Sequence, residues 1–242
     1  MRNVIITGGS RGLGLGIALR LRAAGYRSIS IARRQSDQLA AAMQATGTPG
    51  CLHFREFNLA EISGIAELVK AIRSDFGPIY GLVNNAAIGT SGVLGTMRDP
   101  QIEETVRLNT VSPIVMTKYV VRAMMLDQGG RIINIASIVS DTGFSGLSVY
   151  AATKASMVGF TRSLARELGP LGITVNAIAP GFITTEMTEG LTGSQRQQVI
   201  RRSPLHRLAE VEDIANTAEF LLGDGGRNIT GTTVTVDAGS TA

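Results

Sequence analysis

Short apolar segments alternate along the chain with longer segments in which apolar positions recur every three or four residues. The short segments have the composition of buried strands, and the longer ones have the period of amphipathic helices. We predict seven strands, at residues 4–7, 28–32, 52–57, 79–84, 131–137, 173–178 and 232–236. We predict helices at residues 13–24, 36–46, 62–76, 99–127, 148–168 and 211–222, and irregular or broken helix over 180–203. Pro113 is expected to kink the longest helix.

Strands that alternate with helices are typical of a parallel sheet covered by helices on both faces. With right-handed crossovers, the pattern predicts an α/β fold, a Rossmann-type doubly wound domain with a seven-stranded parallel sheet. We find no linker, repeat or break in composition, so we expect residues 1–242 to form a single domain. The ligand of such a sheet lies outside the carboxyl ends of the strands, and functional residues are therefore expected in the loops that follow them.

The composition narrows the classes of protein to which the chain can belong. Hydrophobic residues make up 44% and charged residues 17%, which excludes a disordered chain. Cys51 is the single cysteine, and His53 and His206 stand far apart, so we expect neither disulfides nor a metal site. No segment approaches the roughly 18 apolar residues of a membrane helix, and no signal peptide is visible. We expect a soluble, cytoplasmic protein.

The positive charge could suggest an anionic partner. The formal net charge is +4, but the arginines that dominate it are scattered and form no basic stripe. We therefore expect neither a nucleic acid nor a membrane as a partner.

Glycine is in excess, at 29 of 242 residues, or about 12% against a usual ~7%. Three glycines, spaced Gly8-x-x-x-Gly12-x-Gly14, lie between the first predicted strand and the first predicted helix. Missing side chains let the backbone approach a pyrophosphate, and the helix N-terminus supplies N–H groups and the positive end of its dipole. The alternative is a plain tight turn. We predict that a dinucleotide contacts Gly8, Ser10, Arg11, Gly12, Leu13 and Gly14.

Two arginines point to the form of the dinucleotide. About 20 residues after such a turn, NAD-binding domains usually carry an acidic residue for the ribose 2′-hydroxyl. Here Arg33 and Arg34 stand at the end of the second predicted strand. Guanidinium groups pair with phosphate through fixed, bidentate donors, which favours NADP(H) over NAD(H), and Arg11 could join them. Otherwise both arginines are simply solvated.

A second group of residues could carry out proton transfer. Ser137 ends the fifth predicted strand, Tyr150 follows 13 residues later, and Lys154 lies four residues beyond Tyr150. Tyr150 and Lys154 share one helix face, so the ammonium should favour the phenolate and lower the pKa of Tyr150. Tyr150 would then exchange protons near neutral pH, while Ser137 hydrogen-bonds the substrate oxygen. Tyr-x-x-x-Lys alone would be an ordinary helix pair, but the serine and the glycine turn favour the catalytic interpretation.

These motifs together resemble the short-chain dehydrogenase/reductase family. Within it, the segments 131–137, 172–176 and 179–183 are most similar to the 3-oxoacyl-[acyl-carrier-protein] reductases. The matching elements cover essentially the whole chain in order: Thr7-Gly8-x-x-x-Gly12-x-Gly14, Asn84-Asn85-Ala86, Asn109, Ser137, Tyr150-x-x-x-Lys154 and Pro180-Gly181.

The resemblance implies a role for each matching residue. Tyr150 would be the general acid in reduction, and Ser137 would polarise the carbonyl. Lys154 would lower the pKa of Tyr150 and hold the nicotinamide ribose, and Asn109 would anchor a water that relays protons to Lys154. The implied cofactor contacts outside the glycine turn are Asn58, Leu59, Asn85, Ala86, Tyr150, Lys154, Pro180, Gly181 and Ile183.

The activity implied by the resemblance is NADPH-dependent reduction of a ketone to a secondary alcohol. The implied substrate is a 3-oxoacyl thioester of acyl-carrier protein or CoA, as in fatty acid metabolism. The segment at about 182–203 would be a substrate lid, and the family commonly forms homotetramers. Reduction of small ketones, oxidation of small alcohols and a non-catalytic NADP-binding protein remain alternatives.

Three features depart from the family pattern. Ala87 stands where Asn-Asn-Ala is usually followed by glycine, and Ala238 replaces a glycine near the end of the chain. The carrier-protein reductases tend to have basic residues at the end of the long helix and after the catalytic helix. Here those places read Leu126-Asp127-Gln128 and Gly169-Pro170-Leu171, which leaves the acyl-carrier protein an open partner.

Overall fold

The protein is described by a computed structural model covering residues 1–127, 129–183 and 193–242. A seven-stranded sheet forms its centre, in the order β3-β2-β1-β4-β5-β6-β7, and every paired strand is parallel to its neighbour. This confirms the predicted fold class. The strands are β1 (Asn3–Thr7), β2 (Arg27–Ala32), β3 (Cys51–Glu56), β4 (Ile79–Asn84), β5 (Gly130–Ile135), β6 (Ile173–Pro180) and β7 (Thr233–Val236).

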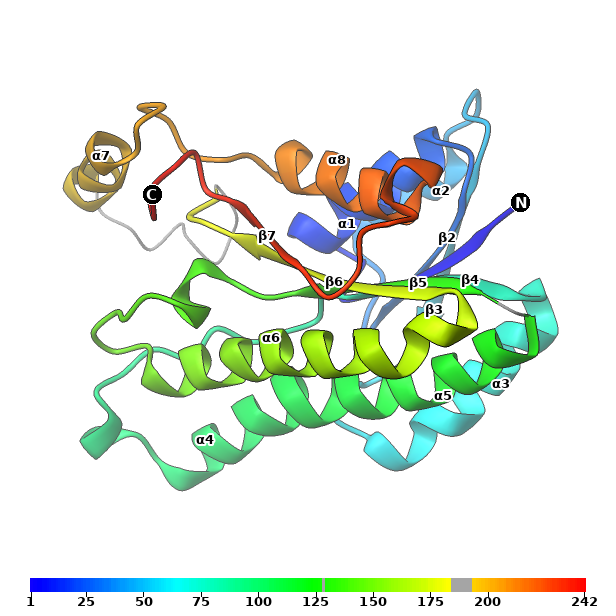
Figure 1. The fold of residues 1–242 in the computed structure, drawn as a ribbon, viewed down its shortest axis with the longest axis horizontal. Helices are drawn as coiled ribbons and strands as arrows, with labels where there is room; N and C mark the ends of the chain where they lie inside the picture. The colour runs from blue at the N-terminus through cyan, green and yellow to red at the C-terminus, as the bar shows by residue number, and fades with distance from the viewer. Residues whose placement is uncertain (128, 184–192) are drawn as a thin grey trace.

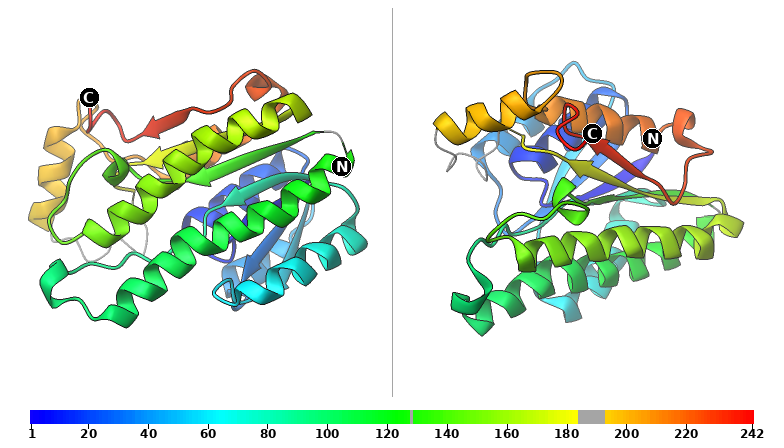
Figure 2. Two further views of the ribbon diagram at one scale, coloured as in Figure 1. Left: turned by 60° about the horizontal axis from the view of Figure 1, so that its bottom comes forward. Right: turned by 60° about the vertical axis from the view of Figure 1, so that its left-hand side comes forward.

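Helices cover both faces of the sheet, as Figures 1 and 2 show. One face carries α1 (Gly12–Ala23), α2 (Asp37–Gln44) and α8 (Val211–Leu222). The other carries α3 (Ile65–Phe76), α4 (Asp99–Val106), α5 (Ser112–Asp127) and α6 (Ser148–Leu168). The short helix α7 (Gly193–Arg202) lies beyond the carboxyl ends of the strands, on the left of Figure 1.

The central strands are apolar on both sides because they are buried on both sides. Side chains alternate between the two faces of a strand, so neighbouring residues enter different cores. Residues paired across neighbouring strands form a row of side chains on one face of the sheet. One row lies in the core under α1 and α8, and the next row lies in the core under α3, α5 and α6. The first row is Ile6, Val83 and Ile133, and the second is Ile5, Leu82 and Ile132.

The predicted long helix over 99–127 is present and contains a π-helical turn, Arg107–Val111, between α4 and α5, with helical backbone on both sides of this turn. Pro113 is the second residue of α5, just after the turn, and the kink expected at Pro113 stays a prediction. Most other predicted elements are confirmed to within two residues at each end, and α6, α8 and β4 have the predicted bounds. Helix α7 lies inside the segment predicted to be irregular, whose residues 184–192 are outside the described part.

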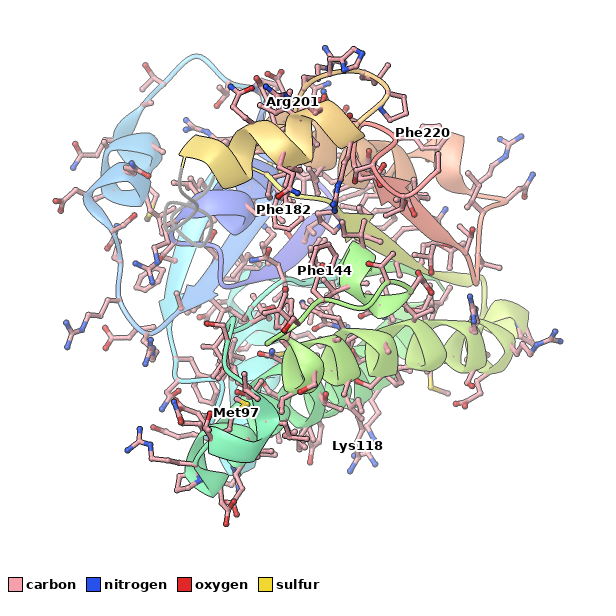
Figure 3. The ribbon with its side chains drawn as sticks, turned by 90° about the vertical axis from the view of Figure 1, so that its left-hand side faces the viewer. Met97, Lys118, Phe144, Phe182, Arg201 and Phe220 are labelled. Atoms are coloured by element: carbon pink, nitrogen blue, oxygen red, sulfur yellow. The ribbon has the colours of Figure 1, made fainter. Side chains whose placement is uncertain are left out.

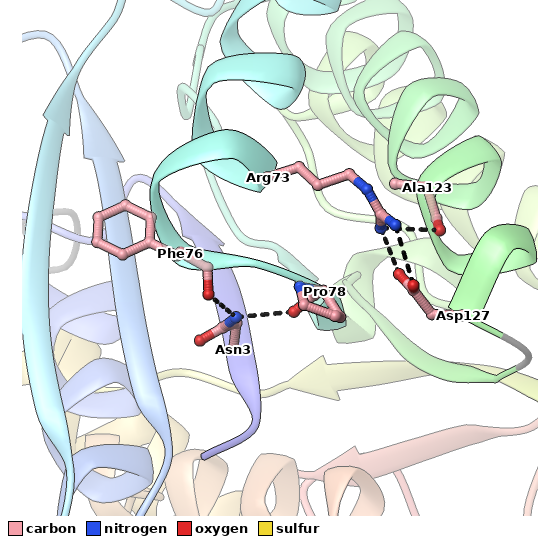
Figure 4. A network of polar contacts seen from close by, with 6 residues as sticks. All are labelled: Asn3, Arg73, Phe76, Pro78, Ala123 and Asp127. Carbon is pink, nitrogen blue, oxygen red and sulfur yellow. Dashed lines mark hydrogen bonds and ion pairs between the residues drawn. The ribbon is translucent and has the colours of Figure 1, made fainter.

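Polar side chains fasten the edge of the sheet at which the strands begin. The Asn3 side-chain amide at the start of β1 donates to the carbonyl oxygens of Phe76 and Pro78, at 2.8 and 2.7 Å. Arg73 on α3 forms a two-pronged ion pair with Asp127 on α5 and also donates to a carbonyl of that helix (Figure 4). These contacts hold the amino-terminal edge, opposite the predicted site.

Candidate active site

The glycine-rich turn joins β1 to α1 at the carboxyl edge of the sheet. It lies at the switch point of the fold, because the chain leaves β1 towards one face and leaves its neighbour β4 towards the other. Gly8 has a φ of +66°, which glycine adopts without strain. A Cβ on Gly14 would overlap the carbonyl oxygen of Gly8 and would lie 2.5 Å from the Nδ2 atom of Asn85. The turn therefore needs glycine for close packing.

The start of α1 is suited to an anion. Its N-cap residue, Arg11, has extended backbone, and no side chain caps the helix, so its first N–H groups remain for a ligand or water. Arg11 is exposed at this point, Ser10 is buried and Leu13 is half-buried. The open space beside Gly12, where a Cβ would meet nothing within 4 Å, together with these N–H groups, fits the pyrophosphate of a dinucleotide.

Thr7 holds the residues after β4 against this turn. Its Oγ1 atom accepts hydrogen bonds from the backbone N–H groups of Asn85 and Ala86, at 2.9 and 3.0 Å. The Asn85 side-chain amide donates in return to the carbonyl oxygens of Thr7 and Gly8, at 2.9 and 3.3 Å. Thr7 was part of the sequence motif but not a predicted site residue, and the structure gives it a positioning role.

The two arginines lie directly after β2, and both are exposed. The connection that carries them is tied to the glycine turn by Ser36, whose hydroxyl donates to the carbonyl oxygen of Ser10. The same hydroxyl caps α2 by accepting from the N–H group of Leu39 at 3.1 Å. Arg33 and Arg34 are therefore mounted on a connection fixed relative to the turn. Sequence reasoning gave no role to Ser36.

Asn58 and Leu59 follow β3 and extend the same edge. The Oδ1 atom of Asn58 accepts from the N–H group of Ala60 at 3.2 Å, and its amide donates to Glu61 at 3.3 Å. Leu59 is buried in the core beneath α3 and α5. In the described structure, Asn58 shapes the turn, and its contact with adenine stays a prediction.

Ser137, Tyr150 and Lys154 come together between the end of β5 and the first turns of α6. The Ser137 side chain lies near enough to the Tyr150 phenol to lower its pKa, and it also accepts from the N–H group of Val139 at 3.4 Å. The ammonium of Lys154, which is 4% exposed, donates to the carbonyl oxygen of Ile135 at 2.7 Å. It lies 5.7 Å from the centre of the Tyr150 ring. The structure thus joins the three residues that the sequence spacing singled out.

The predicted direction of the Tyr150 pKa is wrong for the protein without cofactor. Burial raises the pKa of Tyr150 to about 12, and the neighbouring Ser137 hydroxyl, which lowers this pKa, only partly opposes it. Burial also lowers the pKa of Lys154 to about 8. The spacing placed the two residues on one face, but the ammonium of Lys154 points to the Ile135 carbonyl. At neutral pH the phenol therefore keeps the proton that a general acid must donate.

Asn109 connects the loop after β4 to α6. It lies in the π-helical turn and is 2% exposed. Its side-chain oxygen Oδ1 accepts from the N–H group of Ile88 at 2.9 Å. Its side-chain Nδ2 donates to the Ile88 carbonyl at 2.9 Å and to Thr153 Oγ1 at 3.2 Å. The Thr153 hydroxyl in turn donates to the carbonyl of Tyr150 at 2.7 Å. Asn109 is thus linked to Tyr150 through Thr153, which was not a predicted site residue.

The end of β6 forms the far side of the site. The N–H group of Gly181 donates to the carbonyl of Val236 at 2.9 Å, and a Cβ on Gly181 would lie 2.5 Å from the Cβ atom of Asp237. Pro180 is the last residue of β6, and Ile183 is buried beside Ala209. Of the predicted lid at 182–203, the described part comprises residues 182–183 and 193–203, and residues 184–192 lie outside it.

The chain ends in a turn organised by Asp237. One carboxylate oxygen accepts from the N–H group of Gly239 at 2.8 Å, and the other accepts from Ser240 and Thr241 at 2.7–3.0 Å. Partial burial raises the pKa of Asp237, but these donors outweigh it and hold the pKa below its usual value. The turn also meets the residues after α7, because Ser203 and Leu205 donate to the carbonyl of Ala238.

The described residues contain neither a candidate metal site nor a candidate membrane-spanning helix. No group of three or more His, Cys, Asp or Glu side chains among them is arranged to hold a metal ion. Within the same part of the chain, no helix is both long and apolar enough to cross a membrane.

The chain matches known proteins over nearly its whole length. The sequence model of a family described as enoyl-(acyl carrier protein) reductase matches residues 8–241. The 3-oxoacyl-[acyl-carrier-protein] reductase FabG of Haemophilus influenzae is 40% identical over 237 residues, which cover 97% of this chain and 96% of that protein.

Solved structures match equally well. A short-chain dehydrogenase from Burkholderia cenocepacia in complex with NADP superposes with a TM-score of 0.90 at 32% identity, covering 100% of this chain and 98% of that one. A mutant short-chain dehydrogenase/reductase from Serratia marcescens superposes with a TM-score of 0.92 at 30% identity, with the same coverage.

Proposed function

We propose that this chain, which belongs to the short-chain dehydrogenase/reductase family, reduces a 3-oxoacyl thioester to the 3-hydroxyacyl thioester with NADPH. The observation that carries the proposal is the pair of neighbouring side chains, Tyr150 and Ser137, beside the buried ammonium of Lys154. The pair lies at the edge of the sheet where the glycine turn opens. In this proposal one domain, residues 1–242, holds both the cofactor and the substrate.

The residues divide the work of reduction. NADPH supplies the hydride that the ketone carbon accepts. The hydroxyls of Ser137 and Tyr150 bind the carbonyl oxygen, and Tyr150 gives its proton to that oxygen, so that the ketone becomes an alcohol and Tyr150 a phenolate. The ammonium of Lys154 stabilises the phenolate and, with a pKa of about 8, can return a proton near neutral pH. Asn109 holds the surrounding loop and helix in register.

The preference for NADPH rests on Arg33 and Arg34. Both side chains are exposed at the end of β2, where the ribose 2′-phosphate would lie, and Ser36 ties their connection to the glycine turn. The Burkholderia cenocepacia relative was solved with NADP, which agrees with this assignment. Arg11, the exposed residue at the start of α1, could add a third guanidinium to this group.

The acyl chain of the substrate can be carried by acyl-carrier protein or by CoA. The end of α5 presents Leu126, which is 74% exposed, and the turn after α6 presents Leu171, at the two places where the carrier-protein reductases tend to have basic residues. We therefore include CoA thioesters beside carrier-protein thioesters as substrates. Haemophilus influenzae FabG is named for the carrier protein, which keeps that partner in the proposal.

We also propose that the chain works in the cytoplasm as a homotetramer. Apolar side chains exposed along α5, in the π-helical turn before it and at the end of α4 support association through these helices. They are Val106, Val111, Ile114 and Met125. Sedimentation velocity at micromolar concentration tests this state: a tetramer supports it, and a stable monomer contradicts it.

A cofactor-oxidation screen tests the activity. The panel contains acetoacetyl-CoA, the same acyl group on acyl-carrier protein, a simple ketone and a 2-enoyl thioester. We expect NADPH oxidation with at least one 3-oxoacyl thioester and none with the enoyl thioester. Turnover of the simple ketone alone would favour a small-ketone reductase. Bound NADPH without any turnover would favour a non-catalytic binding protein.

A further inference from the structure

Two phenylalanines face each other across the carboxyl edge of the sheet. Phe144 lies in the connection between β5 and α6, and Phe182 lies just beyond β6. Their ring centres are 5.6 Å apart and their planes meet at 73°, which is an edge-to-face arrangement. Figure 3, which looks onto this edge, shows the two rings next to each other above α6 and beneath α7. The contact bridges two loops that are far apart in sequence.

Each ring belongs to a loop that also carries residues of the proposed reaction. Phe144 lies between Ser137 and Tyr150, which bind the carbonyl oxygen in the proposal. Phe182 lies between Gly181 and Ile183, on the cofactor side of the site. Each ring therefore lies in a loop that also carries residues of the proposed site, at the carboxyl edge of the sheet.

Both loops are tied to neighbouring segments by backbone hydrogen bonds. The connection that carries Phe144 accepts a hydrogen bond at the carbonyl of Gly146 from the N–H group of Gly92, at 2.9 Å. The segment that carries Phe182 is fixed by the hydrogen bond between Gly181 and Val236. Anchored backbones present the rings as a defined surface. Phe144 is nevertheless 38% exposed, and Phe182 is half-buried, so apolar surface remains available.

We propose that Phe144 and Phe182 are specificity-determining residues, whose rings contact the apolar acyl chain beyond the 3-oxo group. This inference rests on the proposed function and adds the substrate class. The enzyme selects thioesters with acyl chains longer than four carbons, because their methylene groups pack against the ring pair. A four-carbon acetoacetyl group ends before it and gains little from the rings.

A chain-length series tests the inference. We compare the wild type with Phe144→Ala, Phe182→Ala and the double variant on 3-oxoacyl thioesters of 4, 8 and 12 carbons, all on one carrier. We expect kcat/KM for the two longer chains to fall roughly 10-fold or more, and for the four-carbon chain to change less than about 3-fold. Phe→Leu at either position should restore much of the loss. NADPH affinity should stay unchanged in all variants.

Phe220→Ala is the matched control. Phe220 is 53% exposed on α8, so its truncation removes the same ring from outside the two loops. Every chain length should keep its wild-type kcat/KM in this variant. Unfolding midpoints of all variants show whether an effect comes from lost structure.

The outcomes separate this inference from the function on which it rests. An equal fall at every chain length would overturn it, because the rings would then only hold the loops. Unchanged preference in the double variant would also overturn it. A wild type that reduces simple ketones but no thioester contradicts the proposed function. In that case the same variants are compared on alkyl ketones of increasing length. The ratio of kcat/KM for long over short ketones then tests the contact with the rings.

Discussion

The nucleotide side and the catalytic side of the carboxyl edge differ in residue types and in burial. On the nucleotide side, glycines make room, the backbone supplies the donors, and Arg33 and Arg34 lie exposed. On the catalytic side, Tyr150 and Lys154 are held among neighbours that displace both pKa values. Binding an anionic cofactor requires space and surface charge, whereas proton transfer requires charged groups away from water. Changes on one side should therefore affect affinity, and changes on the other should affect turnover.

The largest effect among the substitutions below is expected for Lys154→Met, which acts on the catalytic side. Without the ammonium the phenolate of Tyr150 is not stabilised, so kcat should fall by about 10²–10⁴-fold. Steady-state assays with saturating NADPH measure this loss. The wild type should lose activity as the pH rises through about 8, where Lys154 gives up its charge. A variant with more than a tenth of wild-type kcat contradicts this role.

The same variant should reveal the energetic cost of a buried lysine. Between about pH 8 and 10.5 the unfolded chain holds a proton on Lys154 that the folded chain has released. Wild-type stability should therefore rise with pH across this window, by up to about 3 kcal/mol, and Lys154→Met should lack this rise. Urea unfolding at pH 7–10 measures the difference, below the range where Tyr150 acts in the opposite direction. If the unfolding free energies of the wild type and the variant changed with pH in the same way, Lys154 would not be a buried ammonium.

Gly14→Ala probes the nucleotide side. The added Cβ would overlap the Gly8 carbonyl and crowd Asn85, so the cradle must distort. We expect NADPH affinity to fall by about 10- to 100-fold. Gly159→Ala is the control, because a Cβ on this glycine in α6 meets nothing within 4 Å. Calorimetric titration with NADPH decides: equal affinities in the two variants would show that the turn does not hold the cofactor.

Arg33→Asp combined with Arg34→Ala tests which cofactor the exposed arginines select. Loss of the guanidinium groups and a new carboxylate should lower the ratio of kcat/KM for NADPH over NADH by roughly 10- to 100-fold. Arg227→Asp, an exposed arginine after α8, is the control and should leave the ratio unchanged. An unchanged ratio in the double variant would remove the 2′-phosphate contact.

The smallest effect is expected for Asp237→Asn in the C-terminal turn. The lowered pKa means that the carboxylate stabilises the fold above its unfolded pKa near 3.8 and that this stability is lost as the pH falls through the folded pKa. We expect a loss of about 0.5–1 kcal/mol at pH 7 and a smaller loss at pH 3, which lies below the unfolded pKa near 3.8. Asp224→Asn, at an exposed ion pair with Arg2, should change stability less. Urea unfolding at both pH values measures this, and a constant difference contradicts it.

Local patterns were sufficient to predict the fold and part of the site. The period of apolar positions gave the bounds of α6 and α8, and the spacing Gly8-x-x-x-Gly12-x-Gly14 identified a turn that needs glycine. The π-helical turn before α5 could not be predicted, because such a turn has no comparable sequence signal.

Contacts between distant segments could not be predicted in the same way. Thr7 meets Asn85, which lies 78 residues away, and Asn109 meets Thr153, which lies 44 residues away. No local pattern marks such pairs. The spacing of Tyr150 and Lys154 likewise fixed their shared helix face but not their burial, and burial determines the direction of both pKa shifts.

The most direct test of the division between binding and chemistry is a paired measurement on Tyr150→Phe. The substitution removes one hydroxyl from the catalytic side and leaves the glycine turn untouched. We predict that NADPH affinity changes less than about 3-fold while kcat falls about 10²–10⁴-fold, and that Tyr119→Phe on α5 alters neither. A Tyr150→Phe enzyme that keeps wild-type turnover, or that loses NADPH together with turnover, would contradict the account.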